Sequence, residues 1–240
     1  AWLAGFTKGM TELSRQAGCP LLGGDTTRTA KVGDIHAPVT ISITAMGELP
    51  QSMGLTRSGA RPGDDIWVSG CVGGAWAALM HRWGKLTLDA RVFPAAALAM
   101  DRPNPRNALG TALLSSATAC ADISDGLAQD LGHILERSGV DADVLWDAVP
   151  KHPALAALSQ EQQVEAAMSG GDDYELVFTA PADKRGLIEQ ASISALTPVT
   201  RIGRIVEKKP SGAPLAIRDA SGRPLFLPVQ GFDHFAQSAD

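Results

Sequence analysis

The apolar positions of the chain follow two periods, one typical of helices and one typical of strands. At the start they are spaced by three and four residues: Trp2, Phe6, Met10 and Leu13. This spacing predicts a helix that runs to Ala17 and stops at Gly18, because glycine often ends helices. Across residues 38–47 apolar side chains alternate with serine and threonine, which predicts a half-buried antiparallel strand.

The remaining pattern predicts that strands and helices alternate along the chain. Further strands are expected at residues 19–22, 65–69, 118–121, 140–145, 176–179, 199–206 and 215–217. Further helices are expected at residues 75–83, 107–116, 127–135, 154–168 (in pieces) and 182–190. Because hairpin-like alternation also occurs, we expect an α+β (mixed α/β) fold rather than a strictly parallel sheet. The glycine- and proline-containing residues 48–63 are interpreted as a connection between domains.

Composition and charge argue against several classes of protein. With 240 residues, of which 45% are hydrophobic, the chain can bury a sizeable core. Its formal net charge of -5 and its lack of a lysine or arginine run argue against a nucleic-acid partner. It contains no apolar run of membrane-spanning length and opens on no signal-peptide pattern, so we expect no membrane partner. Cys19, Cys71 and Cys120 are widely spaced, which predicts reduced thiols in a cytoplasmic protein and argues against a zinc site.

The stretch at residues 121–127 carries the first candidate chemistry. It lies between a predicted strand and a predicted helix, and Asp122 and Asp125 bracket the turn. We expect Ser124 or Asp125 to cap the helix. Two carboxylates next to free backbone N–H groups suit a cation that carries a phosphate, since the carboxylates bind the cation and the helix terminus binds the anion. The alternative is a capped helix with an additional surface aspartate.

Three turns combine glycine or small residues with acidic side chains. They are Gly23-Gly24-Asp25, residues 122–126 and Gly170-Gly171-Asp172-Asp173. Glycine lets the backbone approach a ligand, and clustered carboxylates repel one another unless a cation lies between them. Magnesium is the expected cation, and we expect the three turns to meet in one pocket. The sequence has neither a Walker A nor a Rossmann glycine motif, which argues against the common types of kinase.

Taken together and in this order, the turns resemble those of a known family, the thiamine-monophosphate kinases of the aminoimidazole-ribonucleotide-synthetase-like superfamily. The resemblance covers nearly the whole chain and rests on residues 23–28, 55–60, 62–64, 122–134, 169–176 and 231–235. It implies a two-domain architecture with a truncated first domain. Residues 1–50 are then the remnant of an N-terminal ATP- and metal-binding domain, and residues 51–240 are the C-terminal α/β domain.

The resemblance also implies a reaction and its site. The reaction is direct in-line phosphoryl transfer from ATP to thiamine monophosphate with Mg²⁺, giving thiamine diphosphate. The acceptor phosphate is largely ionised at neutral pH, so no general base is required. The implied ATP contacts are Gly24, Asp25, Arg57 and Ser124, and the implied metal ligands are Asp25, Asp122 and Asp125. The implied substrate contacts are Asp172, where the family usually has Glu, and Phe232, where it often has Tyr or Trp.

Members of this family carry further acidic ligands upstream, and their first domain makes a homodimer. No aspartate cluster precedes Asp25 in this sequence, so we expect these 240 residues alone to have little or no kinase activity. Two alternatives stay open. One is a sister ATP-dependent synthetase, such as selenophosphate synthetase or a purine-pathway synthetase. The other is a nucleotide- or metal-binding module without turnover.

Overall fold

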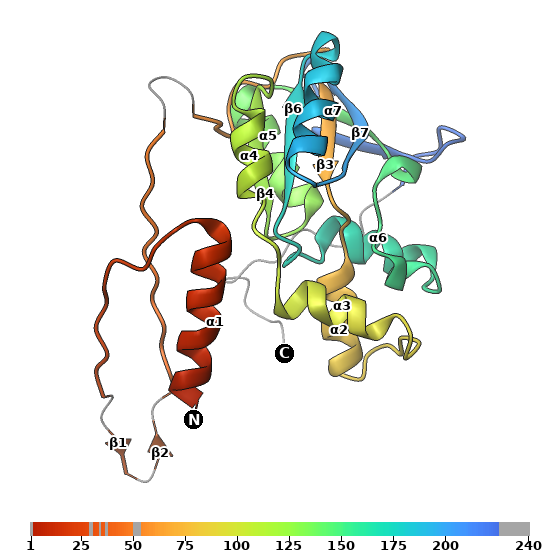
Figure 1. Ribbon diagram of the computed structural model, residues 1–240. Coiled ribbons are helices and arrows are strands. Elements are labelled where there is room, and N and C mark those ends of the chain that lie inside the picture. The colour runs from red at the N-terminus through yellow and green to blue at the C-terminus, as the bar shows by residue number, and fades with distance from the viewer. Residues whose placement is uncertain (1, 29–30, 34, 37, 50–53, 226–240) are drawn as a thin grey trace. The chain divides into compact units, whose positions relative to one another are not determined.

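The chain divides into two units, Ala1–Ser52 and Met53–Asp240. The structure is a computed structural model and describes residues 2–28, 31–33, 35–36, 38–49 and 54–225. Among the described residues, the first unit contains one helix and a short hairpin, and the second contains a large sheet with its helices (Figure 1). The assignment of residues 1–50 to the remnant of an N-terminal domain stays a prediction.

The first unit begins with the helix that the opening apolar spacing predicts. Helix α1 spans Trp2–Ala17, as expected. The rings of Trp2 and Phe6 lie one turn apart on it and stack, with their centroids 5.5 Å from each other. Strands β1, Lys31–Val32, and β2, Ile35–His36, form a short antiparallel hairpin.

Two strands predicted in the first unit, at residues 19–22 and 38–47, are wrong. Both segments lack regular secondary structure, and apolar side chains in them face solvent: Leu22 is 81% exposed and Ile43 is 73% exposed. A strand needs a neighbour that takes up its backbone N–H and C=O groups. Among the described residues of this unit, only β1 and β2 pair as strands. The alternating pattern of residues 38–47 is therefore present without the sheet that it predicts.

The second unit is built on a six-stranded sheet with the order β4-β6-β3-β7-β5-β8. In chain order the strands are β3 Asp65–Ser69, β4 Ala119–Ile123, β5 Asp141–Leu145, β6 Glu175–Ala180, β7 Val199–Val206 and β8 Leu215–Arg218. Neighbouring strands are antiparallel except β5 and β8, which are parallel. This mixed sheet, with its helices, confirms the predicted α+β fold class.

Helices cover both faces of this sheet. They are α4 Asn107–Leu113, α5 Leu127–Ser138, α6 Gln160–Ser169 and α7 Arg185–Ser194. Helices α5 and α6 share one core with the sheet, which includes Ile66, Ile123, Leu131 and Met168. Helices α4 and α7 share another core with it, which includes Trp67, Leu109, Phe178 and Ile188. Successive side chains of a strand point to opposite faces of the sheet. Ile66 and Trp67 of β3 therefore enter opposite cores.

A third apolar cluster lies away from the sheet, between two further helices. Helices α2, Gly74–Arg82, and α3, Phe93–Asp101, pack against each other and against the short 3-10 helix Pro153–Leu155. The remaining 3-10 helices are Trp146–Ala148 and Ala182–Lys184. Within the described residues, no helix is long and apolar enough to cross a lipid bilayer.

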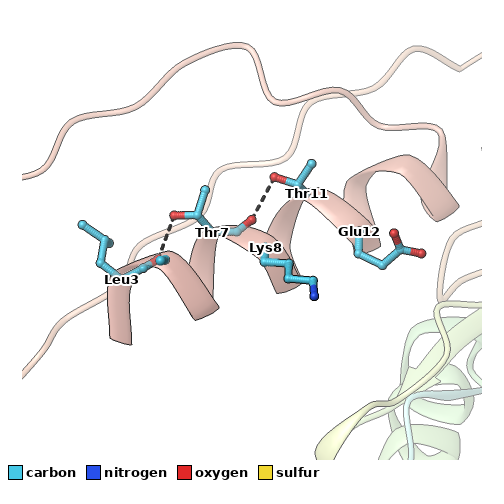
Figure 2. Close-up of a pocket in the computed structure, with 6 residues that line it drawn as sticks. Leu3, Thr7, Lys8, Thr11 and Glu12 are labelled. Atoms are coloured by element: carbon cyan, nitrogen blue, oxygen red, sulfur yellow. Dashed lines mark hydrogen bonds between the residues drawn. The ribbon is translucent and has the colours of Figure 1, made fainter. Parts of the chain in front are cut away.

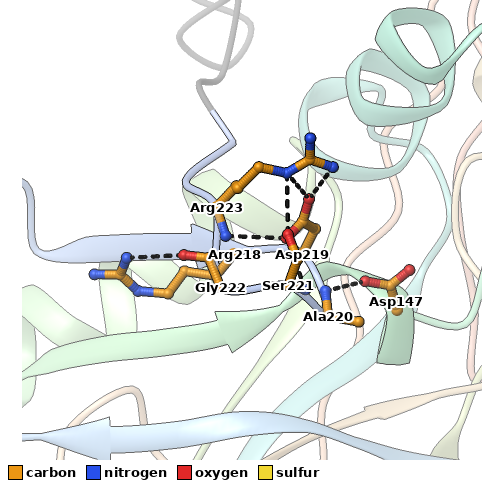
Figure 3. Close-up of polar contacts among 7 residues, drawn as sticks. All are labelled: Asp147, Arg218, Asp219, Ala220, Ser221, Gly222 and Arg223. Carbon is orange, nitrogen blue, oxygen red and sulfur yellow. Dashed lines mark hydrogen bonds and ion pairs between the residues drawn. The ribbon is translucent and has the colours of Figure 1, made fainter.

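Each outer strand of the sheet is contacted by another segment of the chain. Beside β4, the carbonyl of Thr56 accepts a hydrogen bond from the N–H of Cys120 at 2.9 Å. Beside β8, the chain turns at residues 219–223 and folds back, so that the N–H of Leu225 bonds the carbonyl of Ile217 at 2.9 Å. Figure 3 shows this turn, in which the Asp219 carboxylate accepts from the N–H groups of residues 221 and 223.

Candidate functional site

The turn that follows β4 brings its acidic side chains to the end of the sheet. Ile123 is buried in the core under α5, whereas Asp122, which pairs with Leu176 of β6, is exposed. Gly126 then begins α5 with φ 113°, and a Cβ at this position would lie 2.8 Å from the carbonyl oxygen of Met168. Only glycine fits here, because both the backbone angle and the close approach of α6 exclude a side chain.

The predicted cap of α5 by Ser124 or Asp125 is wrong. Gly126 is the residue at the cap position, and no side chain caps it. Instead Asp130, one turn into the helix and fully buried, reaches back: its Oδ2 accepts from the N–H groups of Ser124 and Asp125, both at 3.0 Å. These two N–H groups are therefore not free for a phosphate. The buried Asp130 carboxylate accepts the hydrogen bonds that the sequence analysis expected an anionic ligand to accept.

The turn at residues 170–175 has an unusual backbone and is bound to the turn after β4. Gly171, Asp172 and Tyr174 have φ values of 66°, 59° and 51°, in the left-handed region. The N–H of Asp172 bonds the carbonyl of Ser124, and the N–H of Tyr174 bonds the carbonyl of Ile123, each at 2.8 Å. Left-handed conformations of residues other than glycine are strained and concentrate at functional sites. The structure thus joins the second and third of the three predicted acidic turns.

The joined turns form a region of negative charge. The hydroxyl of Tyr174 donates to Asp172 Oδ1 at 3.2 Å. Burial, followed by the charges of Asp172, Asp122 and Asp125, raises the pKa of Tyr174. Among residues 54–225 none of the ion pairs involves any of these three carboxylates. Asp125 instead accepts a hydrogen bond from the Gln129 amide at 3.3 Å.

The donor set of these turns fits magnesium in part. Carboxylate oxygens are the ligands that Mg²⁺ takes, and it is usually held by one or two carboxylates together with phosphates and water. Asp122 and Asp125 supply two carboxylates without a basic partner. Within the described residues, no three His, Cys, Asp or Glu side chains are close enough to form a complete metal site. The described residues therefore offer at most a partial set of ligands for this ion.

Two carboxylates of the third turn point inwards and anchor it. Asp173 Oδ2 accepts from the N–H of Gly73, at the start of α2, at 2.8 Å. Glu175, whose side chain is 7% exposed, forms a two-pronged ion pair with Arg106 and accepts from the Ser69 hydroxyl at 2.5 Å. The sequence analysis gave Asp173, Glu175 and Arg106 no separate roles. Their partners are distant in sequence, so spacing carried no signal for them.

The protonation of Asp173 should make the stability of the protein depend on pH near neutrality. Burial and the nearby charges of Glu175 and Asp172 raise the pKa of Asp173 from 3.8 to about 7, against the opposing effect of its hydrogen bonds with N–H groups of α2. A raised pKa in the folded state means that folding favours the protonated form. The stabilising contribution is therefore complete below pH 3.8 and is lost as the pH rises through about 7.

We expect Asp173→Asn to reduce the pH dependence of the free energy of unfolding. In the unaltered protein, this group should make the free energy of unfolding, measured with urea, about 1–2 kcal/mol higher near pH 5 than near pH 8. Each pKa unit corresponds to about 1.4 kcal/mol, and the effect is reduced because the side chain is only half-buried. Asparagine keeps an acceptor for the Gly73 N–H. The exposed Glu136→Gln serves as the control. An unchanged pH dependence in Asp173→Asn would contradict the prediction.

The other predicted site residues lie elsewhere in the chain. Gly24 and Asp25 are exposed in the first unit, where Asp25 Oδ1 accepts from the N–H of Thr26 at 2.8 Å. Arg57 is exposed in the segment beside β4, and its carbonyl accepts from the Ser138 hydroxyl at 3.3 Å. Phe232 lies outside the described residues. Their assignments as ATP, metal and substrate contacts stay predictions.

An open hollow on α1 contains none of the predicted site residues. Figure 2 shows the residues that line it, Leu3, Ala4, Thr7, Lys8, Thr11 and Glu12. The hydroxyls of Thr7 and Thr11 donate to carbonyls of the preceding helical turn at 2.9 and 2.8 Å, so they serve the helix itself. The hollow brings together no cluster of groups with catalytic or metal-binding chemistry.

Comparison with known proteins relates the whole chain to one group. The family model of the AIR synthase related protein C-terminal domain matches residues 61–214, and that of the N-terminal domain matches residues 1–49. The thiamine-monophosphate kinase of Haemophilus influenzae is 36% identical over 240 residues, which cover 99% of this chain and 70% of that protein.

Solved structures give the same picture. The crystal structure of thiamine-monophosphate kinase from Stenotrophomonas maltophilia matches with a TM-score of 0.65 and 38% identity, over 74% of this chain and 56% of that one. A structure of AaThiL complexed with AMPPCP and TMP matches with a TM-score of 0.60 and 28% identity, over 75% of this chain and 54% of that one. The match thus spans little more than half the length of these solved chains.

Proposed function

The chain belongs to the thiamine-monophosphate kinases, a family of phosphotransferases, and from this premise we propose that it takes part in the ATP-dependent phosphorylation of thiamine monophosphate to thiamine diphosphate. The observation that carries the proposal is the junction of two acidic turns by backbone hydrogen bonds from Asp172 and Tyr174. A relative solved with AMPPCP and TMP supports the same pair of ligands. The negative charge of the joined turns supports the proposal, because two phosphorylated molecules need a cation between them.

In this proposal the residues of the chain bind and orient rather than transfer protons. Asp122 and Asp125 would hold Mg²⁺, which when bound neutralises charge on the phosphates. Asp130 holds the backbone of the turn, because its carboxylate accepts from the N–H groups at residues 124 and 125. The acceptor phosphate is ionised at neutral pH, since the second pKa of a phosphate monoester is about 6. No general base is therefore assigned.

The remaining assignments extend the same proposal. Gly24, Asp25, Arg57 and Ser124 would contact ATP, and Asp25 would be a further metal ligand. Asp172 and Phe232 would contact the thiamine monophosphate. We also propose that the protein works in the cytoplasm and forms a homodimer through its first domain, as the resemblance implies.

Substitution of the two metal-binding candidates should weaken magnesium-dependent nucleotide binding. We expect Asp122→Asn and Asp125→Asn each to reduce the affinity for an ATP analogue with Mg²⁺ by at least about tenfold, equivalent to about 1.4 kcal/mol, because each removes a charged ligand. Isothermal titration calorimetry measures this change. Asp183→Asn, an exposed carboxylate in a 3-10 helix on the surface, should leave the affinity unchanged. Equal affinities in all three variants would contradict the proposed ligands.

The reaction itself is tested with ATP, Mg²⁺ and thiamine monophosphate. Formation of thiamine diphosphate supports the proposal. Because we expect these 240 residues alone to turn over weakly, the first measurement is the binding of thiamine monophosphate by calorimetry. Tight ATP binding without a response to thiamine phosphates would favour a binding module. A thermal-shift response to selenide or to purine intermediates would favour a sister synthetase.

A further inference from the structure

The single tyrosine of the chain, Tyr174, adopts a backbone conformation that a bulky residue rarely takes. Its φ of 51° lies in the left-handed region, where glycine or asparagine would be less strained. The strained position is fixed by the hydrogen bond from its N–H to the carbonyl of Ile123, at the end of β4. A tyrosine held here is not explained by the demands of the turn, and strain of this kind concentrates at functional sites.

The side chain of Tyr174 does not serve the core either. It is 41% exposed, whereas Phe178, four residues later on β6, is fully buried. Its hydroxyl donates to Asp172 Oδ1 at 3.2 Å, so the two side chains that emerge from the turn hold each other in place. An aromatic ring fixed at the surface presents an apolar face whose orientation is already set. Such pre-ordered aromatic side chains are typical of ligand contacts.

The charges around the ring select the kind of ligand. The negative charges of Asp172, Asp122 and Asp125 all reach the phenol and contribute to its raised pKa, after burial. None of the ion pairs among residues 54–225 neutralises these carboxylates. A metal ion needs only the oxygens and gains little from an aromatic face. An organic cation with a flat ring uses both, because it is attracted by the Asp172 carboxylate beside the ring, which is not one of the proposed metal ligands, and by the negative face of the aromatic ring.

We propose that Tyr174 is a specificity-determining residue, whose ring contacts the positively charged ring of a thiamine phosphate while its hydroxyl holds the Asp172 carboxylate beside that ring. This inference rests on the proposed function. The thiazolium ring of thiamine carries a permanent positive charge, as the arrangement requires. The role adds a residue to the predicted substrate contacts Asp172 and Phe232.

Calorimetry on the intact chain separates this role from a structural one. We expect Tyr174→Leu to lower the affinity for thiamine monophosphate by about three- to thirtyfold, which is the range for a cation on an aromatic ring. Tyr174→Phe keeps the ring and should lower this affinity by about threefold or less, through the lost contact with Asp172. The affinity for an ATP analogue with Mg²⁺ should stay within about twofold, since only the cationic ligand uses the ring. Trp83→Leu removes another exposed aromatic side chain and should change neither affinity.

A second readout needs no substitution. Because the chain has one tyrosine, incorporation of 3-fluorotyrosine places a single ¹⁹F label at residue 174. Thiamine monophosphate should shift this resonance, whereas the ATP analogue alone should not. An unshifted resonance on saturation, or unchanged thiamine monophosphate affinity in Tyr174→Leu, would overturn the inference while the proposed function stands. If the unaltered protein binds the ATP analogue but no thiamine phosphate, the proposed function fails and the inference with it.

Discussion

Replacing Arg106 by alanine should lower the free energy of unfolding by about 3–5 kcal/mol, the cost of leaving a buried charge without its partner. Arg106 and Glu175 are 17% and 7% exposed, and the guanidinium contacts both oxygens of the carboxylate, with Nε at 2.7 Å from Oε2. After the substitution the Ser69 hydroxyl would remain as a side-chain donor to Glu175. The carboxylate packs closely against Gly70, where an added Cβ would collide with it.

A surface pair provides the control for this prediction. Arg82 and Asp101 make the same two-pronged contact, but their side chains are 42% and 48% exposed. We therefore expect Arg82→Ala to change the free energy of unfolding by at most about 1 kcal/mol. Urea denaturation measures both variants. The double variant Arg106→Met with Glu175→Gln removes both charges and should recover part of the loss; an equal loss in the double variant would show that packing, not charge, is responsible.

Replacing Gly171 by alanine should cost about 2–4 kcal/mol and separate the two acidic turns. Gly171 has φ 66°, and a Cβ there would lie 2.5 Å from the carbonyl oxygen of Ser124. That carbonyl accepts the N–H of Asp172 at 2.8 Å, so relief of the clash must lengthen the hydrogen bond that joins the turns. The Gly171→Ala protein should accordingly lose stability in urea denaturation and also lose affinity for ligands of the joined turns.

The matched control is another glycine of the same region. Gly132 lies within α5, and a Cβ there would have no atom within 4 Å. Gly132→Ala should stabilise the protein by about 0.5–1 kcal/mol, because alanine favours the helical backbone more than glycine does. If Gly171→Ala were as mild as Gly132→Ala, the close approach of the two turns would not be essential.

Local patterns predicted much of the second unit. Strand β7 occupies Val199–Val206, the range expected from the sequence, and α5 begins at Leu127 directly after the acidic turn. The pattern also contained a signal that was not used. Asp130 falls on the same helical face as Leu127 and Ile134, and a carboxylate on an apolar face indicates a specific buried partner. Helix α3 was missed because its alanine-rich sequence gives little contrast between an apolar and a polar face.

Contacts between distant segments could not be predicted. Asp173 bonds Gly73 across 100 positions of sequence, and Glu175 bonds Arg106 across 69. Such pairings depend on the order of strands in the sheet, which hydrophobic periodicity does not specify. The strand predicted at residues 38–47 failed for a related reason, since alternation indicates a strand only when a neighbour is available to pair with it.

The covered outer strands of the sheet restrict how the second unit can meet other proteins. Proteins with a bare edge strand can be extended by a peptide or by another copy, which adds a strand through main-chain hydrogen bonds. Here the segment at Thr56 lies along β4 and the returning chain at Leu225 lies along β8, so both positions are already taken. A peptide that added a strand at either of these positions would therefore have to displace the segment that is bonded there. At the same positions these segments oppose edge-to-edge pairing of the sheet with another copy.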